Sequence, residues 1–189
     1  MADSTSRPLD ASSPLVLSTR ELPRGAGEMR EVARTAPAPA GLGLPMIGVP
    51  EGAELDLDLR MESATEGVFV SGTVTAPLHG ECGRCLQEIS DTLQVHVGEL
   101  FAYPGSTTDE TTDADEVRRL QDELADLEPV VRDAVVLELP STPLCRPDCP
   151  GLCAQCGQPM AELPPDHAHE SLDPRWSALA GWQDGPAGS

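Results

Sequence analysis

The chain has 189 residues and a formal net charge of -20, and all twelve of its basic residues are arginine. So negative a field repels phosphate backbones, which argues against broad, sequence-independent binding to nucleic acid and favours a basic protein partner. Hydrophobic residues make up 39% of the chain and aromatics 3%. The hydrophobic core must therefore be thin and built from Val, Leu and Ala, so we expect another interaction to help hold it.

The first twenty residues contain no positive stretch followed by an apolar run, and no segment approaches the ~18 apolar residues of a membrane span. We therefore expect a cytoplasmic protein without a membrane partner, in which cysteines are more often metal ligands than disulfides. The composition divides the chain into five parts. These are a disordered N-terminus (1–12), a β-rich core (13–103), an acidic loop (104–116), a helix with a Cys/His tail (117–183) and a disordered C-terminus (184–189).

The first candidate contact residues lie in an arginine-containing segment near the N-terminus. Its members are Arg20, Arg24, Arg30 and Arg34, followed by prolines and glycines typical of an extended loop over residues 37–43. The segment could touch RNA or a protein partner. Alternatively it is a solvated linker, because Glu21, Glu28 and Glu31 are interleaved with the arginines.

A strict two-residue alternation begins at Leu55 and continues through Leu57, Leu59 and Met61, with charged residues between them. This pattern predicts a half-buried strand. Residues 68–76 and 89–97 repeat the period, which predicts at least three antiparallel strands in a sheet or barrel-like core.

Helical spacing of apolar residues appears after the acidic loop. It predicts a helix over residues 127–139, capped by Asp126 and ended by Pro140. Residues 117–125 fit either a helix or a strand. The expected fold class is α+β, mainly an antiparallel sheet with one or two helices and a cysteine-rich tail.

The first cysteine pair, Cys82-Gly-Arg-Cys85, lies between two predicted strands. Two thiolates at this spacing on a tight turn can both reach one tetrahedral zinc ion. A redox dithiol has the same spacing but is expected before a helix. The flanking strands therefore favour metal binding.

The second cluster places four cysteines within twelve residues, with Pro and Gly between them. It is formed by Cys145, Cys149, Cys153 and Cys156 and is followed by His167 and His169. With the first pair this gives eight candidate ligands, enough for two tetrahedral zinc sites.

We prefer a partition with Cys82, Cys85, Cys145 and Cys149 in one site and Cys153, Cys156, His167 and His169 in the other. The alternative is a single zinc site that uses the first pair and two later cysteines, with both histidines solvated. Four protein ligands close the coordination sphere of zinc. The zinc is therefore expected to be structural, and no small-molecule substrate or catalytic motif is evident.

The segments that contain these motifs resemble the YceD family of large ribosomal RNA subunit accumulation proteins, in an actinobacterial form. The resemblance spans roughly residues 14–182 and is most specific at Cys82-Gly-Arg-Cys85-Leu86 and from Gly151 to Gly157. It implies a non-enzymatic ribosome-biogenesis factor that supports synthesis, processing or stability of 23S rRNA. In many relatives a cysteine pair stands where His167 and His169 stand here, which implies that both histidines are ligands.

Two functional hypotheses follow. In the first, the protein supports ribosome biogenesis. It does so either by holding a basic ribosomal protein or a large-subunit precursor, which we favour, or by local rRNA contact through the arginine segment. In the second, it is a zinc- or thiol-responsive regulator that sequesters a protein partner. An enzyme, either a dithiol oxidoreductase or a zinc hydrolase, fits the sequence less well than both.

Overall fold

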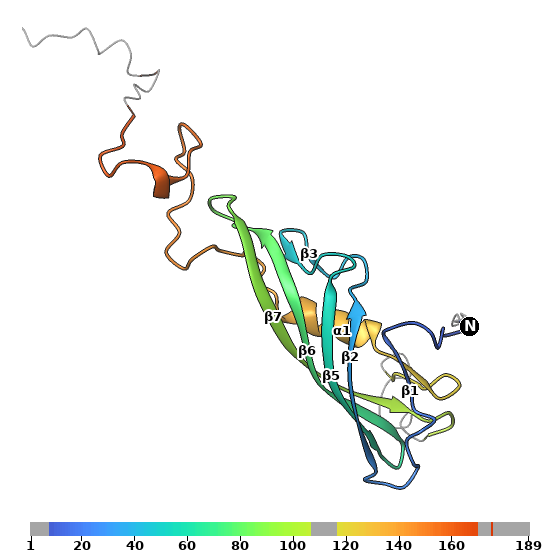
Figure 1. Ribbon diagram of the computed structural model, residues 1–189. Coiled ribbons are helices and arrows are strands. Elements are labelled where there is room, and N and C mark those ends of the chain that lie inside the picture. The colour runs from blue at the N-terminus through green and yellow to red at the C-terminus, as the bar shows by residue number, and fades with distance from the viewer. Residues whose placement is uncertain (1–7, 107–116, 170–174, 176–189) are drawn as a thin grey trace, which may run out of the picture.

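The computed structural model describes residues 8–106, 117–169 and 175. Its main feature is an antiparallel sheet of six strands in the order β2-β5-β6-β4-β3, with β7 on the other edge of β6 (Figure 1). The strands are β2 (Met29–Pro37), β3 (Gly43–Leu44), β4 (Ile47–Gly48), β5 (Glu54–Ser63), β6 (Gly67–Glu81) and β7 (Glu88–Ala102).

The alternation in the sequence decides which face of the sheet is buried. Leu55, Leu57, Leu59 and Met61 of β5 are all buried, whereas the acidic residues between them face solvent. Strands β6 and β7 alternate in the same way and direct their valines into the same core. Alternating side chains lie on opposite faces of a strand, so the predicted strands and their buried face are confirmed.

Strand β2 was not expected, because most of its residues were interpreted as a contact segment or a solvated linker. It pairs with β5 along its whole length, from Met29 opposite Glu62 to Pro37 opposite Glu54. Its buried-face positions include Arg30 and Arg34, whose long side chains hide the period-two signal. Pro37 is tolerated because β2 is an edge strand and Pro37 is its last residue.

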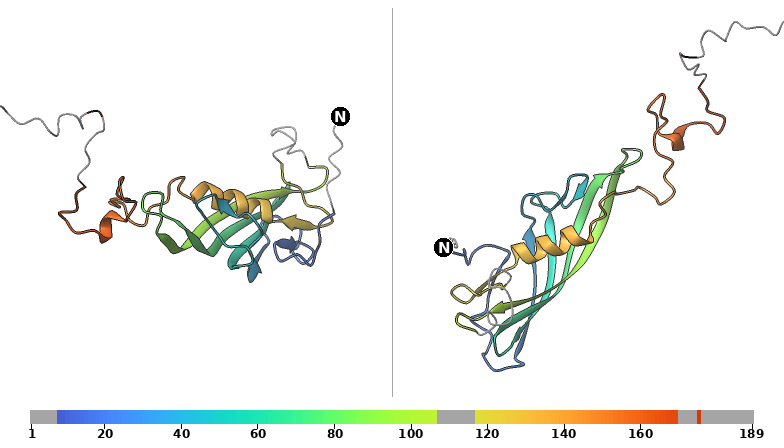
Figure 2. Two further views of the ribbon diagram at one scale, coloured as in Figure 1. Left: turned by 90° about the horizontal axis from the view of Figure 1, so that it is seen from above. Right: turned by 180° about the vertical axis from the view of Figure 1, so that it is seen from behind.

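One helix covers the buried face of the sheet. Helix α1 (Glu128–Glu138) agrees with the predicted boundaries to within one residue, and Val130, Val131 and Val135 are buried in the core. Its first backbone N–H, that of Glu128, donates to Asp126 Oδ1 at 3.0 Å. The expected capping residue therefore acts from one position before the N-cap, which is Leu127. Figure 2 shows the helix lying across the strands.

Residues 117–125, open between helix and strand, contain no α-helix. Their last residues start β8 (Leu124–Asp126), which pairs with β1 (Val16–Ser18) in a separate two-stranded sheet. Together β1 and β8 attach the N-terminal segment beside the start of α1. A single turn of 3-10 helix, η2 (Met160–Glu162), lies in the C-terminal segment.

The main sheet does not close into the barrel-like form that we allowed for. Strand β2 pairs with β5, strand β7 pairs with β6, and within the described residues these two edges do not pair with each other. Helix α1 and the β1–β8 pair cover one face, while the opposite face stays polar. A single covered face suffices for an antiparallel sheet, so closure is not needed to bury the apolar residues.

Strands β6 and β7 form a hairpin of two 15-residue strands, and its tip lies at the far end of the sheet (Figure 1). The turn at the tip contains Cys82 and Cys85. After α1 the chain passes this tip, where Pro143 accepts a hydrogen bond from Gly83 N–H at 2.8 Å. The hairpin therefore brings the first cysteine pair to the C-terminal cysteines.

Three predicted regions lie wholly or mainly outside the described residues. They are most of the N-terminus, most of the acidic loop, and the C-terminal end including 184–189. In the part of the chain that the structure describes, no helix is long and apolar enough to span a membrane.

The contribution of the β5 core face can be measured by substitution. Leu59→Ala removes a side chain that is 2% exposed and should lower the free energy of unfolding by about 2–5 kcal/mol. Leu137 is 85% exposed and provides the control, because Leu137→Ala should change the free energy of unfolding by less than about 0.5 kcal/mol. Chemical denaturation followed by circular dichroism measures both. Equal effects would show that β5 is not packed as described.

Candidate metal sites

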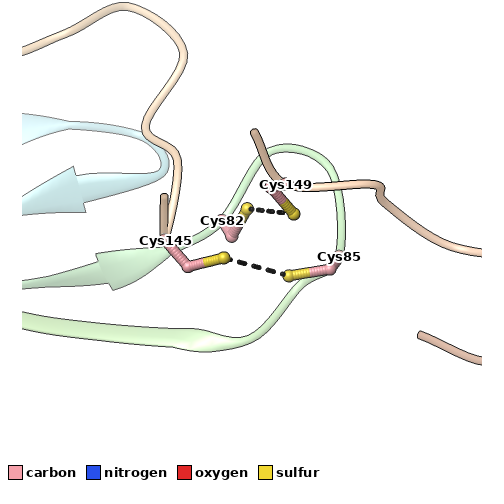
Figure 3. A group of neighbouring side chains, drawn as sticks. All are labelled: Cys82, Cys85, Cys145 and Cys149. Carbon is pink, nitrogen blue, oxygen red and sulfur yellow. Dashed lines mark hydrogen bonds between the residues drawn. The ribbon is translucent and has the colours of Figure 1, made fainter. Parts of the chain in front are cut away.

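The first group of possible ligands, here called the cysteine site, joins the β6–β7 turn to the loop after α1. It consists of Cys82, Cys85, Cys145 and Cys149, whose Sγ atoms all lie within 4.8 Å of one another (Figure 3). Cys82, Cys85 and Cys149 are buried and form a small apolar cluster with Leu144 and other neighbours. This cluster is separate from the main core.

Sulfur separations in the cysteine site match a tetrahedron around one ion. Cys82 Sγ lies 3.8 Å from Cys149 Sγ, and Cys85 Sγ lies 3.6 Å from Cys145 Sγ. Four sulfurs at the usual zinc–sulfur distance would be about 3.8 Å apart. A disulfide would require about 2.05 Å, and all six cysteines are free. The donor set and spacing therefore fit zinc.

The backbone of the first turn is arranged around its sulfurs. Cys82 N–H donates to Gln87 O at 2.8 Å, and Leu86 N–H donates back to Cys82 O at 2.9 Å. These two bonds close a loop in which Leu86 has a positive φ of 61°. Such turns leave other amides free to point at the thiolates, as structural zinc sites require.

Hydrogen bonding and burial give two thiols of the cysteine site very different pKa values. The backbone N–H of Cys145, with smaller contributions from Arg84 and Cys85, lowers the pKa of Cys82 to about 6. Burial, reinforced by the neighbouring thiols, raises the pKa of Cys145 to about 12. Cys82 is therefore the more acidic of these two thiols, and Cys145 must release a proton when it binds a cation.

A second group, here called the histidine site, lies entirely within the C-terminal segment. Cys153 Sγ is 3.3 Å from His169 Nε2, and Cys156 Sγ is 3.7 Å from His167 Nε2. Sulfur and nitrogen ligands of one tetrahedral zinc would be about 3.6 Å apart. The pKa of Cys153 is lowered to about 6, mainly by a hydrogen bond from the backbone N–H of Cys156. The backbone N–H of Gln155 and the side chain of His167 contribute further hydrogen bonds.

The histidine site repeats the turn of the cysteine site. Cys153 N–H donates to Gln158 O at 2.8 Å, and Gly157 N–H donates to Cys153 O at 2.8 Å. Gly157 has a φ of 71°, so it holds the position that Leu86 holds in the first turn. The two sites differ in setting, because Cys156 and His169 are exposed whereas three of the four ligands of the cysteine site are buried.

The eight predicted ligands are thus brought together in two groups of four, with the partition that we preferred from their spacing. The histidines lie beside Cys153 and Cys156. In the single-site alternative they would instead be solvated and distant from any metal. Each group supplies four side chains of the types that zinc prefers. Both sites therefore fit structural zinc.

Sequence reasoning missed the arginine that fastens the two halves of the cysteine site. Arg84 Nη1 donates to Cys149 O at 3.0 Å, and a Cβ on Gly151 would lie 3.3 Å from Arg84 O. Gly151 has a φ of 79°, so it is suited to this close approach. The feature of the sequence that could have pointed to this contact is the basic residue between the two cysteines of the first pair.

Arg20 and Arg24, two of the four candidate contact residues, both reach Glu123. Arg20 Nε lies 3.6 Å from one carboxylate oxygen and Arg24 Nη2 lies 3.0 Å from the other. The guanidinium of Arg24 also stacks 5.5 Å from the centre of the Tyr103 ring. These contacts hold the segment after β1 against the end of the β6–β7 hairpin.

Arg30 and Arg34 belong to strand β2. Arg30 forms an ion pair with Glu21, and Arg34 Nη2 donates to Val16 O at 3.0 Å. Burial lowers the pKa of Arg34. The four arginines thus have partners within the chain, and contact with RNA or a protein stays a prediction.

An open antiparallel sheet with two Cys/His groups at one end defines a β-sheet protein with candidate structural metal sites. The chain belongs to the YceD family: the family model described as "Large ribosomal RNA subunit accumulation protein YceD" matches residues 70–182. The matched range contains all eight candidate ligands. The resemblance inferred from the sequence is confirmed.

Several mycobacterial proteins are similar over most of their length. A protein of Mycobacterium tuberculosis described as uncharacterized is 55% identical over 168 residues, which cover 89% of this chain and 81% of the relative. A protein of Mycobacterium leprae with the same description is 45% identical and covers 88% and 76%. Bacillus subtilis YlbN is 25% identical over 65% of this chain and 67% of its own. No solved structure matches.

Metal content tests the two-site arrangement. Purified, reduced protein should contain two zinc ions per chain, because each group supplies four ligands. Cys149→Ser and His169→Asn should each leave one. His96→Asn is the control, because His96 is exposed on β7 and should leave two. One zinc in the unsubstituted protein would support the single-site alternative, and none would contradict both arrangements.

Zinc affinity should depend on pH in a fixed direction. Cys82 and Cys153, with pKa values of about 6, carry a proton below that pH, so protons compete with zinc increasingly as the pH falls through 6. A chromophoric chelator at a series of pH values measures the release. The exposed histidine site should lose its zinc first and the buried cysteine site later. Release that is independent of pH, or in the reverse order, would contradict the assignment.

Proposed function

We propose that this protein is a non-enzymatic, zinc-stabilised factor that supports synthesis, processing or stability of 23S rRNA in the cytoplasm. The observation that carries this proposal is membership of a family described by accumulation of large-subunit ribosomal RNA. The geometry of the two sites agrees with a role in which metal holds the structure.

A structural role for zinc follows from the number of ligands. Both groups supply four side chains, so a bound zinc would have no open position for water or substrate. Hydrolytic zinc enzymes keep such a position. The cysteine site also joins segments distant in sequence, as a structural clasp does.

A basic ribosomal protein, or a large-subunit precursor that contains one, is the proposed direct partner. The net charge of -20 attracts basic proteins and repels phosphate. Three of the four arginines proposed for RNA contact are paired with carboxylates, which reduces the positive charge they could offer to RNA. Contact with rRNA through this segment would therefore be local and secondary.

Loss of the protein should lower the amount of mature 23S rRNA relative to 16S rRNA. Gel quantification of total RNA from a deletion strain measures this ratio, and sedimentation places the tagged protein with large-subunit precursors. Wild-type protein and the Leu137→Ala control should restore the ratio. Cys85→Ser, which removes a ligand of the cysteine site, should restore it poorly. An unchanged ratio in the deletion strain would contradict the proposal.

The alternative, a zinc- or thiol-responsive regulator that sequesters a partner, is supported by the exposure of Cys156 and His169. Exposed thiolate ligands are accessible to oxidants. Mild peroxide should then release zinc from the histidine site together with the partner. Partner retention after zinc release would exclude this alternative.

A further inference from the structure

A groove lies beside the cysteine site, between the β3–β4 hairpin and the ends of β6 and β7. Its volume is 670 Å³. Its lining includes residues 44–50, the end of β6 from His79 to Glu81, and then Leu86 and Glu88. Leu86 and Met46 are 59% and 37% exposed, so two large apolar side chains lie open to solvent here.

Leu86 occupies a backbone position that suits glycine. Its φ is 61°, and Gly157 has nearly the same φ and hydrogen bond in the second turn. A leucine in the left-handed region costs free energy that glycine avoids. Because the Leu86 side chain is mostly exposed, packing within the chain does not explain why leucine stands there.

Two like charges face each other at the rim of the groove. Glu81 and Glu88 are directly opposite in the register of β6 and β7, and both are exposed. Directly opposed like charges destabilise an antiparallel pair. Within the described residues neither carboxylate forms an ion pair: nearby Arg84 donates instead to Cys149 O.

Three locally unfavourable features therefore meet at one groove: a left-handed leucine, exposed apolar side chains and an unneutralised acidic pair. We propose that this groove docks a basic segment of a protein partner, in which a large apolar side chain contacts Leu86 and Met46 and flanking Lys or Arg residues pair with Glu81 and Glu88. The inference rests on the proposed function for the partner being a basic ribosomal protein.

The lining favours a basic peptide over RNA. None of the residues that line the groove is an arginine, and its charged members are Glu81 and Glu88. Phosphates would meet carboxylates there, whereas ammonium or guanidinium groups would be attracted. An apolar anchor with charged neighbours is also the usual composition of a protein hot spot and its rim.

Leu86→Gly separates docking from folding. Glycine relieves the left-handed backbone, so the zinc-loaded variant should keep two zinc ions and melt at the same or a higher temperature. Its affinity for the fluorescein-labelled peptide Lys-Arg-Leu-Arg-Lys, measured by anisotropy at physiological ionic strength, should fall about fivefold or more. Leu137→Ala, which removes another exposed leucine, should leave binding unchanged.

The acidic pair has its own matched control. Glu81→Gln with Glu88→Gln should weaken peptide binding about fivefold, whereas Asp56→Asn with Asp58→Asn, which removes two exposed carboxylates from β5, should change it less than twofold. A peptide with Ser in place of Leu should bind the unsubstituted protein more weakly than the original peptide does. Its affinities for the unsubstituted protein and for the Leu86→Gly variant should be equal. Amide shifts in residues 44–50 and 79–88 should mark the site.

Equal losses from both charge pairs, or no effect of Leu86→Gly, would overturn the groove as the docking site. An RNA oligonucleotide that shifts the same amides would also overturn it. If purified large-subunit ribosomal proteins bind wild type and both groove variants equally, the groove proposal fails and the proposed function stands. If the peptide results hold but deletion leaves 23S rRNA unchanged, the proposed function fails and the groove remains a basic-peptide site.

Discussion

The contact between the β6–β7 turn and the loop at residues 145–149 holds the C-terminal segment on the sheet. The sulfur pairs Cys82–Cys149 and Cys85–Cys145 lie at tetrahedral separations. The Arg84 side chain donates to Cys149 O, and Gly83 N–H donates to Pro143 O just before this loop. Apolar packing is limited here to a small cluster separate from the main core. A bound ion would supply the cohesion that this cluster is too small to provide. The histidine site follows directly after this contact in the chain.

The sequence predicted the parts of the fold in which one physical signal dominates. Alternation identified β5 because leucines lie on one face and charges on the other, and the helix was bounded by Asp126 and Pro140. The cysteines and histidines lie in the two groups that we preferred, because each tight turn brings its own pair of donors together. Strand β2 was missed, since Arg30 and Arg34 occupy positions on its buried face and interrupt the apolar alternation.

Other features could not be read without the three-dimensional arrangement. The pairing of Glu81 with Glu88 depends on the hairpin register, and the left-handed conformation of Leu86 belongs to the turn that contains Cys82 and Cys85. The sequence also gave no means to see that Glu123 would neutralise Arg20 and Arg24, because more than ninety residues separate them. Charge interpreted from composition therefore overstated the free basic surface near the N-terminus.

The two candidate metal sites differ in how much chain a bound ion would cross-link. Cys82 and Cys149 are separated by 67 positions, whereas Cys153 and His169 are separated by 16. Closing a longer loop removes more conformational entropy from the unfolded chain, so zinc in the cysteine site would act as a reversible staple between distant segments. The histidine site closes only its own short loop and can form locally. The zinc supply would thus control a cross-link between distant segments at the cysteine site, and only a short local loop at the histidine site.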